Sequence, residues 1–137
     1  MKIFLDANIL VSVLNKEYPL FSHSSRILSL ADDKNFEVFS SPLCLAIAFY
    51  FAEKKNKKTA RQKMELLCKK LSISAITENI VEKAVNNPAI HDFEDGLAYY
   101  AALESKCRCI ITEDADDFYF SAIEVLSCKA FFEKYLV

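Results

Sequence analysis

The chain has 137 residues, of which 53% are apolar, and this suits one domain over residues 1–137 with a real hydrophobic core. Its formal net charge of −2 gives no overall attraction to nucleic acid, so binding a polyanion would require a local basic patch or a bound cation. The only glycine, Gly96, excludes the glycine-rich phosphate loops of the Rossmann and Walker types.

The first part of the chain alternates β-type runs with helical patterns. We expect a strand over 1–5, a helix over 7–15, a helix that begins at Pro19 and ends near 32, and a strand over 36–40. Ser41 and Pro42 form a helix start signal. The helix that follows over 43–52 is apolar on all sides, which predicts that it is central and buried.

The next segment is strongly basic. Six cations crowd into ten residues, namely Lys54, Lys55, Lys57, Lys58, Arg61 and Lys63. Apolar residues at helical spacing follow as far as Leu71, so the pattern indicates a basic helical hairpin. Two interpretations stay open: a solvated helical face, and a surface that grips a polynucleotide backbone.

The second half continues the alternation. We expect strands over 72–76, 107–112 and 123–126, and helices from Thr77 to about 85, from Asp92 to about 105 and from Ser127 to about 135. Regular alternation of strands and helices predicts an α/β fold, with a central parallel sheet covered by helices on both faces.

Cysteine usage and hydropathy indicate the cellular setting. The five cysteines are odd in number and no signal peptide is expected, which favours a reducing cytoplasm. Cys107 and Cys109 form a C-x-C pair without a neighbouring Cys or His pair at zinc spacing, so buried thiols are favoured over a zinc site. No apolar stretch approaches about 20 residues, so no membrane span is expected.

Acidic residues gather where strands end and helices begin. Asp6 closes the first strand, Asp92 and Asp95 open a helix, and Asp114 and Asp117 follow a strand. Loops at the carboxyl ends of parallel strands converge on one crevice, so these acids can meet there. Because grouped carboxylates repel one another and need a cation, Mg²⁺ or Mn²⁺ chemistry is the leading hypothesis.

Each acid also has an explanation that needs no chemistry. Asp6 can simply cap the helix that follows it, and acids are favoured in the first turn of any helix. Asp92 is expected to be such a cap, which leaves Asp95 as the better metal ligand. A solvated loop explains some of the charges at 114–117.

Three segments together resemble the signature segments of the PIN domain. They are FLDANIL at 4–10, DFEDGLAYYAA at 92–102 and ITEDADDF at 111–118. Nearly the whole chain is similar to single-domain PIN proteins, including VapC-type toxins. The resemblance implies a three-layer α/β/α sandwich, a Mg²⁺- or Mn²⁺-dependent ribonuclease, a homodimer and, for VapC-type members, an inhibitory antitoxin protein.

The resemblance also implies residue roles. Asp6, Asp95 and Asp114 match the metal-binding acids, and Asp117 is the alternative to Asp114 in the same segment. Asn8 and Thr112 match polar residues that orient the pocket. The candidates for RNA contact are the basic residues Lys54, Lys55, Lys57, Lys58 and Arg61.

One position departs from the family pattern. Ile47 stands where the family usually has a glutamate, and losing a carboxylate weakens metal binding. Asp92 or Asp117 is the candidate to fill the pocket instead. The alternative function is therefore a degenerate PIN domain that binds RNA or a protein partner without cutting. A haloacid-dehalogenase-like phosphohydrolase is disfavoured, because Asn8 stands where that chemistry wants a second acid.

Overall fold

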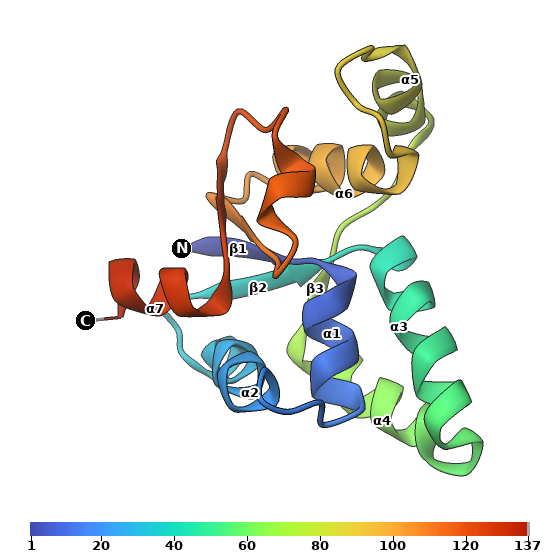
Figure 1. The fold of residues 1–137 in the computed structure, drawn as a ribbon, viewed down its shortest axis with the longest axis vertical. Helices are drawn as coiled ribbons and strands as arrows, with labels where there is room; N and C mark the ends of the chain where they lie inside the picture. Colours follow the sequence, from blue (N-terminus) through green and yellow to red (C-terminus); the bar gives the residue numbers. More distant parts are fainter. Residues whose placement is uncertain (137) are drawn as a thin grey trace.

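Five parallel strands form the central sheet of the structure, a computed structural model that describes residues 1–136 (Figure 1). The strands are β1 (Lys2–Leu5), β2 (Glu37–Ser40), β3 (Ser72–Ile73), β4 (Cys109–Ile111) and β5 (Glu124–Leu126). They lie in the order β3-β2-β1-β4-β5, so the direction of winding reverses at β1. Open sheets of this kind bind ligands beyond the carboxyl ends of the strands at such a reversal.

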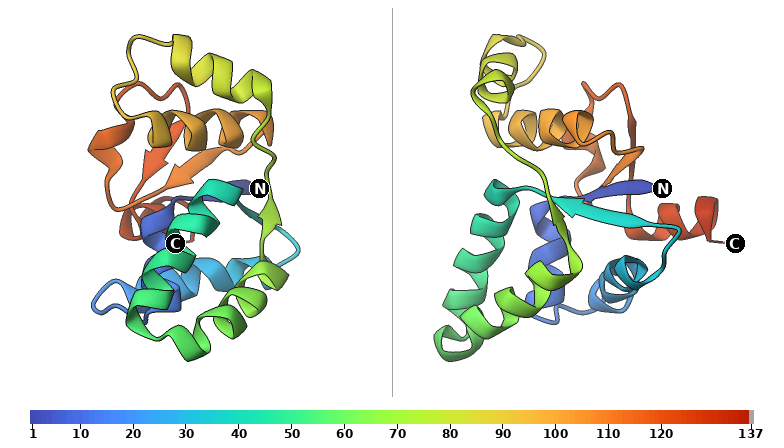
Figure 2. Two further views of the ribbon diagram at one scale, coloured as in Figure 1. Left: turned by 90° about the vertical axis from the view of Figure 1, so that its right-hand side faces the viewer. Right: turned by 180° about the vertical axis from the view of Figure 1, so that it is seen from behind.

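Helices cover both faces of the sheet. α5 (Glu78–Asn86) and α6 (Phe93–Glu104) lie on one side, and α1 (Ala7–Leu14), α2 (Phe21–Ser29) and α4 (Lys57–Lys70) lie on the other (Figures 1 and 2). α3 (Pro42–Lys55) packs between α1 and α4, and α7 (Cys128–Tyr135) packs against α2 and β5. The predicted α/β/α sandwich is therefore confirmed. No helix in residues 1–136 is both long and apolar enough to span a bilayer.

Most helices begin where the sequence predicts, behind a side chain that caps the first turn. Ser41 accepts a hydrogen bond from the backbone N–H of Cys44 at 3.1 Å, and Pro42 occupies the first turn of α3. Thr77 and Ser127 cap α5 and α7 in the same way. Such caps satisfy backbone donors that the helix itself leaves free.

The apolar helix α3 is less buried than its sequence predicts. Cys44, Leu45 and Ala48 pack into the core, but the side chains of Tyr50 and Phe51 are 56% and 43% exposed. The helix contacts α1, α4 and α6 and lies at the edge of the molecule (Figure 1), so part of its surface is exposed. The prediction that this helix is buried was therefore wrong for the face that carries Tyr50 and Phe51.

Smaller differences concern the cysteines and the element ends. All five cysteines are free, and four are buried as expected, but Cys68 on α4 is exposed. The predicted strand over 107–112 is confined to Cys109–Ile111, and the one over 72–76 to Ser72–Ile73. α2 begins at Phe21, two residues after Pro19.

The close approach of α5 and α6 depends on the single glycine. A Cβ atom at Gly96 would lie 2.9 Å from Cγ2 of Ile90 and 3.2 Å from Cβ of Ala84. Gly96 follows Asp95 directly, so this contact helps to fix the first turn of α6. That turn carries one of the predicted site acids.

Candidate active site at the strand ends

The carboxyl ends of the central strands are tied to one another. The backbone N–H of Asp6 donates to the carbonyl oxygen of Ile111 at 3.0 Å, which joins the end of β1 to the end of β4. The hydroxyl of Ser40 donates to the carbonyl oxygen of Leu5 at 2.8 Å, which joins β2 to β1. The loops that follow these strands therefore start from a rigid edge.

Asp6 is both a helix cap and a cavity residue. Its Oδ1 accepts a hydrogen bond from the backbone N–H of Ala7 at 2.8 Å, and its Oδ2 accepts one from the hydroxyl of Thr112 at 2.9 Å. The Cys44 thiol lies 3.9 Å from Oδ1. Burial raises the pKa of the Asp6 carboxyl, and the charge of Asp114 raises it further. The carboxylate is thus held in one orientation near another negative charge.

Asn8 and Thr112 connect this carboxylate to Asp114. The Nδ2 amide of Asn8 donates to Oγ1 of Thr112 at 2.9 Å and to Oδ2 of Asp114 at 3.1 Å. Its Oδ1 accepts the backbone N–H of Glu113 at 3.2 Å. Thr112 is fully buried and also accepts the backbone N–H of Asp114 at 3.1 Å. The two polar residues therefore stand between two site acids, as an orienting role requires.

Asp95 approaches the other acids from the first turn of α6. The side chain is half-buried, and its pKa is raised to about 7, mainly by burial and then by the charges of Asp92, Asp6, Asp117 and Glu94. The negative charges of four neighbouring carboxylates thus raise the pKa of Asp95. At neutral pH the cluster carries repulsion that a bound cation would relieve.

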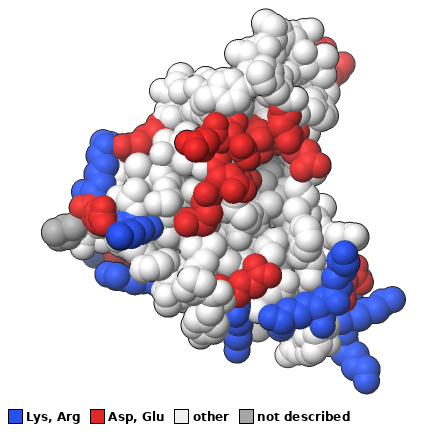
Figure 3. All heavy atoms as spheres, in the orientation of Figure 1, with Lys and Arg blue, Asp and Glu red and all other residues white. Residues whose placement is uncertain are grey.

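A cavity of about 400 Å³ opens at this edge of the sheet. Four of the predicted residues line it, namely Asp6, Asn8, Asp95 and Asp114. Two further acids, Glu17 and Glu94, and a set of apolar residues complete the wall, the latter including Val11, Leu43, Ile47 and Phe51. Figure 3 shows the dense group of acidic side chains on this face of the molecule.

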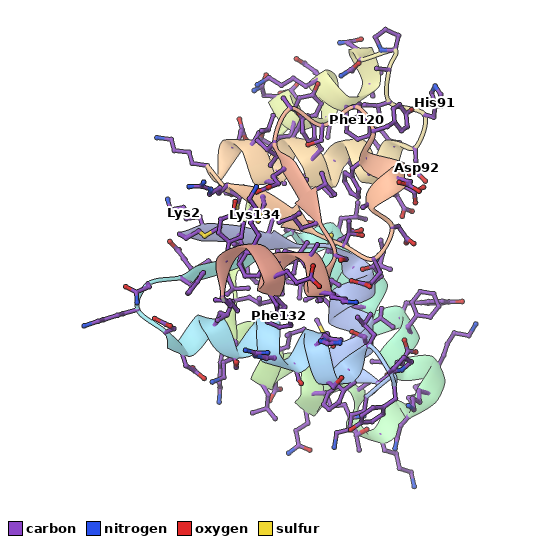
Figure 4. The ribbon with its side chains drawn as sticks, turned by 60° about the vertical axis from the view of Figure 1, so that its left-hand side comes forward. Lys2, His91, Asp92, Phe120, Phe132 and Lys134 are labelled. Atoms are coloured by element: carbon purple, nitrogen blue, oxygen red, sulfur yellow. The ribbon has the colours of Figure 1, made fainter. Side chains whose placement is uncertain are left out.

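Other predicted residues lie outside the cavity wall. Asp92 caps α6, since its Oδ1 accepts the backbone N–H of Glu94 at 2.9 Å and of Asp95 at 3.4 Å, and it lies at the edge of the molecule (Figure 4). Asp117 belongs to the short 3₁₀ turn η2 (Ala115–Phe118) and acts on Asp95 by charge. Asp92 and Asp117 therefore do not line the cavity, but their charges act on Asp95, which does.

The basic residues lie in the last turn of α3 and the first two turns of α4. The ammonium of Lys54 lies 5.2 Å from the centre of the Tyr50 ring, and the guanidinium of Arg61 lies 5.8 Å from that of Phe49. Lys55 donates to the carbonyl oxygen of Asn15 at the end of α1. Lys57 and Lys58 begin α4 and are exposed. These cations lie beside the cavity and outside its wall.

Sequence reasoning missed the two glutamates of the wall. Glu94 precedes Asp95 directly, so its proximity was visible, but neighbours on a helix point about 100° apart and only the packed structure shows that both reach the cavity. Glu17 follows α1 after Lys16, whose φ of 50° turns the chain. No pattern in the sequence indicated where that turn would place the side chain.

The donor set fits a hard divalent cation. Within residues 1–136 the ion pairs are Lys70–Asp32 and Lys134–Glu124, so the cavity acids have no basic partner. In the same range no three Asp, Glu, His or Cys side chains are grouped closely enough to hold an ion between them as they stand. Mg²⁺ usually keeps several water ligands and takes only one or two carboxylates. The cavity therefore suits an ion of that kind better than a fully protein-coordinated one.

Comparisons with known proteins give a family and a fold. A family model described as PIN domain matches residues 2–116. The structure is similar to that of VapBC2 from Rickettsia felis bound to a DNA fragment from its promoter, with a TM-score of 0.69, 19% identity and coverage of 93% of this chain and 98% of that one.

It is also similar to VapC20 from Mycobacterium tuberculosis, described as a sarcin-ricin loop cleaving toxin. Here the TM-score is 0.70 and the identity 16%, with 90% of this chain and 98% of that one covered. At such identities the likeness shows a shared fold. No curated protein sequence matches the chain.

Proposed function

Because this chain belongs to the PIN-domain family, we propose that it is a metal-dependent endoribonuclease that hydrolyses RNA phosphodiester bonds. One observation carries the proposal. Asp6, Asp95 and Asp114 are remote in sequence, yet they line one cavity at the point where the sheet reverses its winding. They have no basic partner among residues 1–136, so their charge is free to bind a cation.

The chain's own residues would prepare the site for this reaction. Asp6, Asp95 and Asp114 would hold Mg²⁺ or Mn²⁺ together with its water ligands, and the ion would supply Lewis-acid activation of a phosphodiester and of a water nucleophile. Thr112 and Asn8 hold the Asp6 and Asp114 carboxylates through hydrogen bonds of 2.9 to 3.1 Å. Because these carboxylates are positioned before any ligand arrives, little reorganisation is needed on binding.

RNA would approach the cavity over the basic residues at the end of α3 and the start of α4. The exposed cations there can contact phosphates beside the cavity, and they offset the acidic charge that would otherwise repel the strand. They are Lys54, Lys55, Lys57, Lys58 and Arg61. This placement supports RNA rather than a small phosphate ester as the substrate.

The same proposal includes a cellular role as the toxin of a toxin–antitoxin pair. The support is the structural likeness to VapBC2 and to the VapC20 toxin. An antitoxin protein would then be the natural partner. Homodimerisation remains a prediction that analytical ultracentrifugation would check, and the free cysteines support a reducing cytoplasm as the setting.

A second candidate is a PIN domain that binds without cutting. Ile47 lines the cavity, so the position where the family usually carries an acid supplies an apolar surface here. One ligand or base is thereby lost. This candidate predicts a protein that binds RNA or a protein partner but is inactive with any divalent ion.

The test is cleavage of structured RNA with Mn²⁺ by three proteins: wild type, Asp6→Asn and Asp116→Asn. Asp116 is an exposed acid outside the cavity wall, so its change removes the same charge without touching the site. We expect wild type and Asp116→Asn to cut alike, and Asp6→Asn to lose activity by about 100-fold. Equal cleavage by wild type and Asp6→Asn would refute the assignment. Inactive wild type that still binds RNA would favour the second candidate.

A further inference from the structure

One face of α3 carries a solvent-exposed stripe that leads out of the cavity. Ile47, Tyr50, Phe51 and Lys54 are spaced so that a helix places them side by side. Ile47 and Phe51 line the cavity, and Tyr50 and Phe51 are 56% and 43% exposed. From Ile47 to Lys54 the helix rises by about 10 Å, or two turns. We call these four residues the α3 platform.

The two aromatic rings of the platform are held in place. Their centres lie 5.3 Å apart with the ring planes at 83°, an edge-to-face contact. The backbone under them is fixed to α1, because the Asn15 amide donates to the carbonyl oxygen of Phe51 at 3.3 Å and Lys55 donates to that of Asn15. Exposed aromatic surface on a rigid support is typical of a binding site.

The charges at the two ends of the platform select its ligand. At one end lies the acidic cavity, which would hold a cation under the proposed function, and at the other lie Lys54, Lys57 and Lys58. Figure 3 shows the large acidic group and the basic group on the same face, with a smaller acidic group next to the basic one. Within residues 1–136 none of these lysines belongs to an ion pair. Aromatic rings flanked by cations are the combination that binds single-stranded nucleic acid.

Ile47 gains a role in this arrangement. Together with Val11, Leu43 and Phe51 it supplies apolar surface to the cavity that the carboxylates also line. A nucleobase has apolar faces, so this surface can accept the base next to a phosphate that the cation of the proposed function would contact. A carboxylate at position 47 would be a poor neighbour for that face.

We propose that the α3 platform binds unpaired nucleotides by stacking, with bases against Phe51 and Tyr50 and a phosphate near Lys54. A duplex cannot make this contact, because its bases already stack on one another and offer no free face. This inference rests on the proposed function for the choice of RNA as ligand. As a statement about binding, it is tested without cleavage.

The sequence offers a direct optical test, because it contains no tryptophan. In an Asp6→Asn background, which keeps the RNA intact, Tyr50→Trp introduces one fluorophore on the platform. The control is Val85→Trp in the same background. Val85 is 65% exposed on α5, which lies at the top of the view in Figure 1, whereas α3 runs down the lower right side. The probes are a short single-stranded oligoadenylate and the same strand paired with its complement.

We expect the single strand to quench the fluorescence of the Tyr50→Trp variant and to leave that of the Val85→Trp variant unchanged, with little effect of the duplex on either. Tyr50→Ala and Phe51→Ala should each weaken binding of the single strand by about fivefold or more, and Val85→Ala should not. The proposal would be overturned if the duplex quenched the Tyr50→Trp variant as strongly as the single strand. It would also be overturned if the single strand caused no quenching and the alanine variants kept their affinity. The exposed platform would then be a candidate surface for a protein partner.

Failure of the platform and failure of the nuclease are distinguishable. If the single strand quenches the Tyr50→Trp fluorescence but the wild type does not cleave RNA, the platform proposal is upheld and the proposed nuclease activity is rejected. Active wild type whose Tyr50→Ala and Phe51→Ala variants bind single strands normally would reject the platform and keep the cleavage. Circular dichroism of each variant shows whether it is folded.

Discussion

Asp95→Asn should stabilise the protein when no metal is present. Burial, and then the charges of the neighbouring acids, raise the pKa of Asp95 from 3.8 to about 7, about three units, and one unit corresponds to about 1.4 kcal/mol. The side chain is only half-buried, so solvent screening reduces the effect on stability to about 1–2 kcal/mol at neutral pH and above. Asparagine has nearly the same shape and no charge, so it removes this penalty.

The sign of the pH dependence follows from linkage. Well below pH 3.8 the carboxyl is protonated in both folded and unfolded chains, and the penalty is absent. As the pH rises towards 7, the unfolded chain ionises first and is favoured. The contribution of Asp95 to stability is therefore present at low pH and lost as the pH rises through about 7.

The assay is denaturant unfolding in a chelating buffer at about pH 3 and about pH 8. The free energy of unfolding of Asp95→Asn should exceed that of wild type by about 1–2 kcal/mol at the higher pH and match it at the lower. Asp116→Asn, the matched control, should show no such gain. Excess Mn²⁺ should reverse the order by stabilising wild type, by about 2.7 kcal/mol at 100 times its Kd. An Asp95→Asn variant no more stable than wild type at the higher pH would refute the reasoning.

Three further substitutions test other parts of the account. Thr112→Val should lower the free energy of unfolding, measured with denaturant, by about 1–3 kcal/mol. The reason is that the buried hydroxyl donates to Asp6 and accepts from the Asn8 amide and the Asp114 backbone N–H. Thr112→Ser keeps a hydroxyl and should lose much less stability. Ile47→Glu should raise Mn²⁺ affinity about tenfold in titration calorimetry and lower metal-free stability; unchanged affinity would show that position 47 does not face the ion. Gly96→Ala should destabilise by about 1 kcal/mol in thermal unfolding, since overpacking against Ile90 exceeds the gain in helix propensity.

Much of the candidate site was predictable because it depends on local rules. Asp6 and Asp114 follow strands, and parallel strands end at one edge of a sheet. Asp95 lies one turn into a helix whose cap, Asp92, was visible in the sequence. Position along a strand or helix was therefore enough to bring these acids together.

The rest depends on packing that periodicity does not encode. A helix that is apolar on every side has no preferred buried face, so the exposure of Tyr50 and Phe51 was decided by where α1 and α4 lie against α3. Glu17 reaches the cavity through a turn of irregular backbone. Cysteine is usually a buried residue, yet the side chain of Cys68 on α4 is exposed to solvent.

The most direct test of the central claim is an anomalous diffraction measurement on crystals grown with Mn²⁺. The account predicts one ion in the cavity, bonded at about 2 Å to an oxygen of Asp6 and to at least one of Asp95 and Asp114, with water completing its shell beside Ile47. A cavity that holds no ion in those crystals, or an ion bound without Asp6, would contradict it.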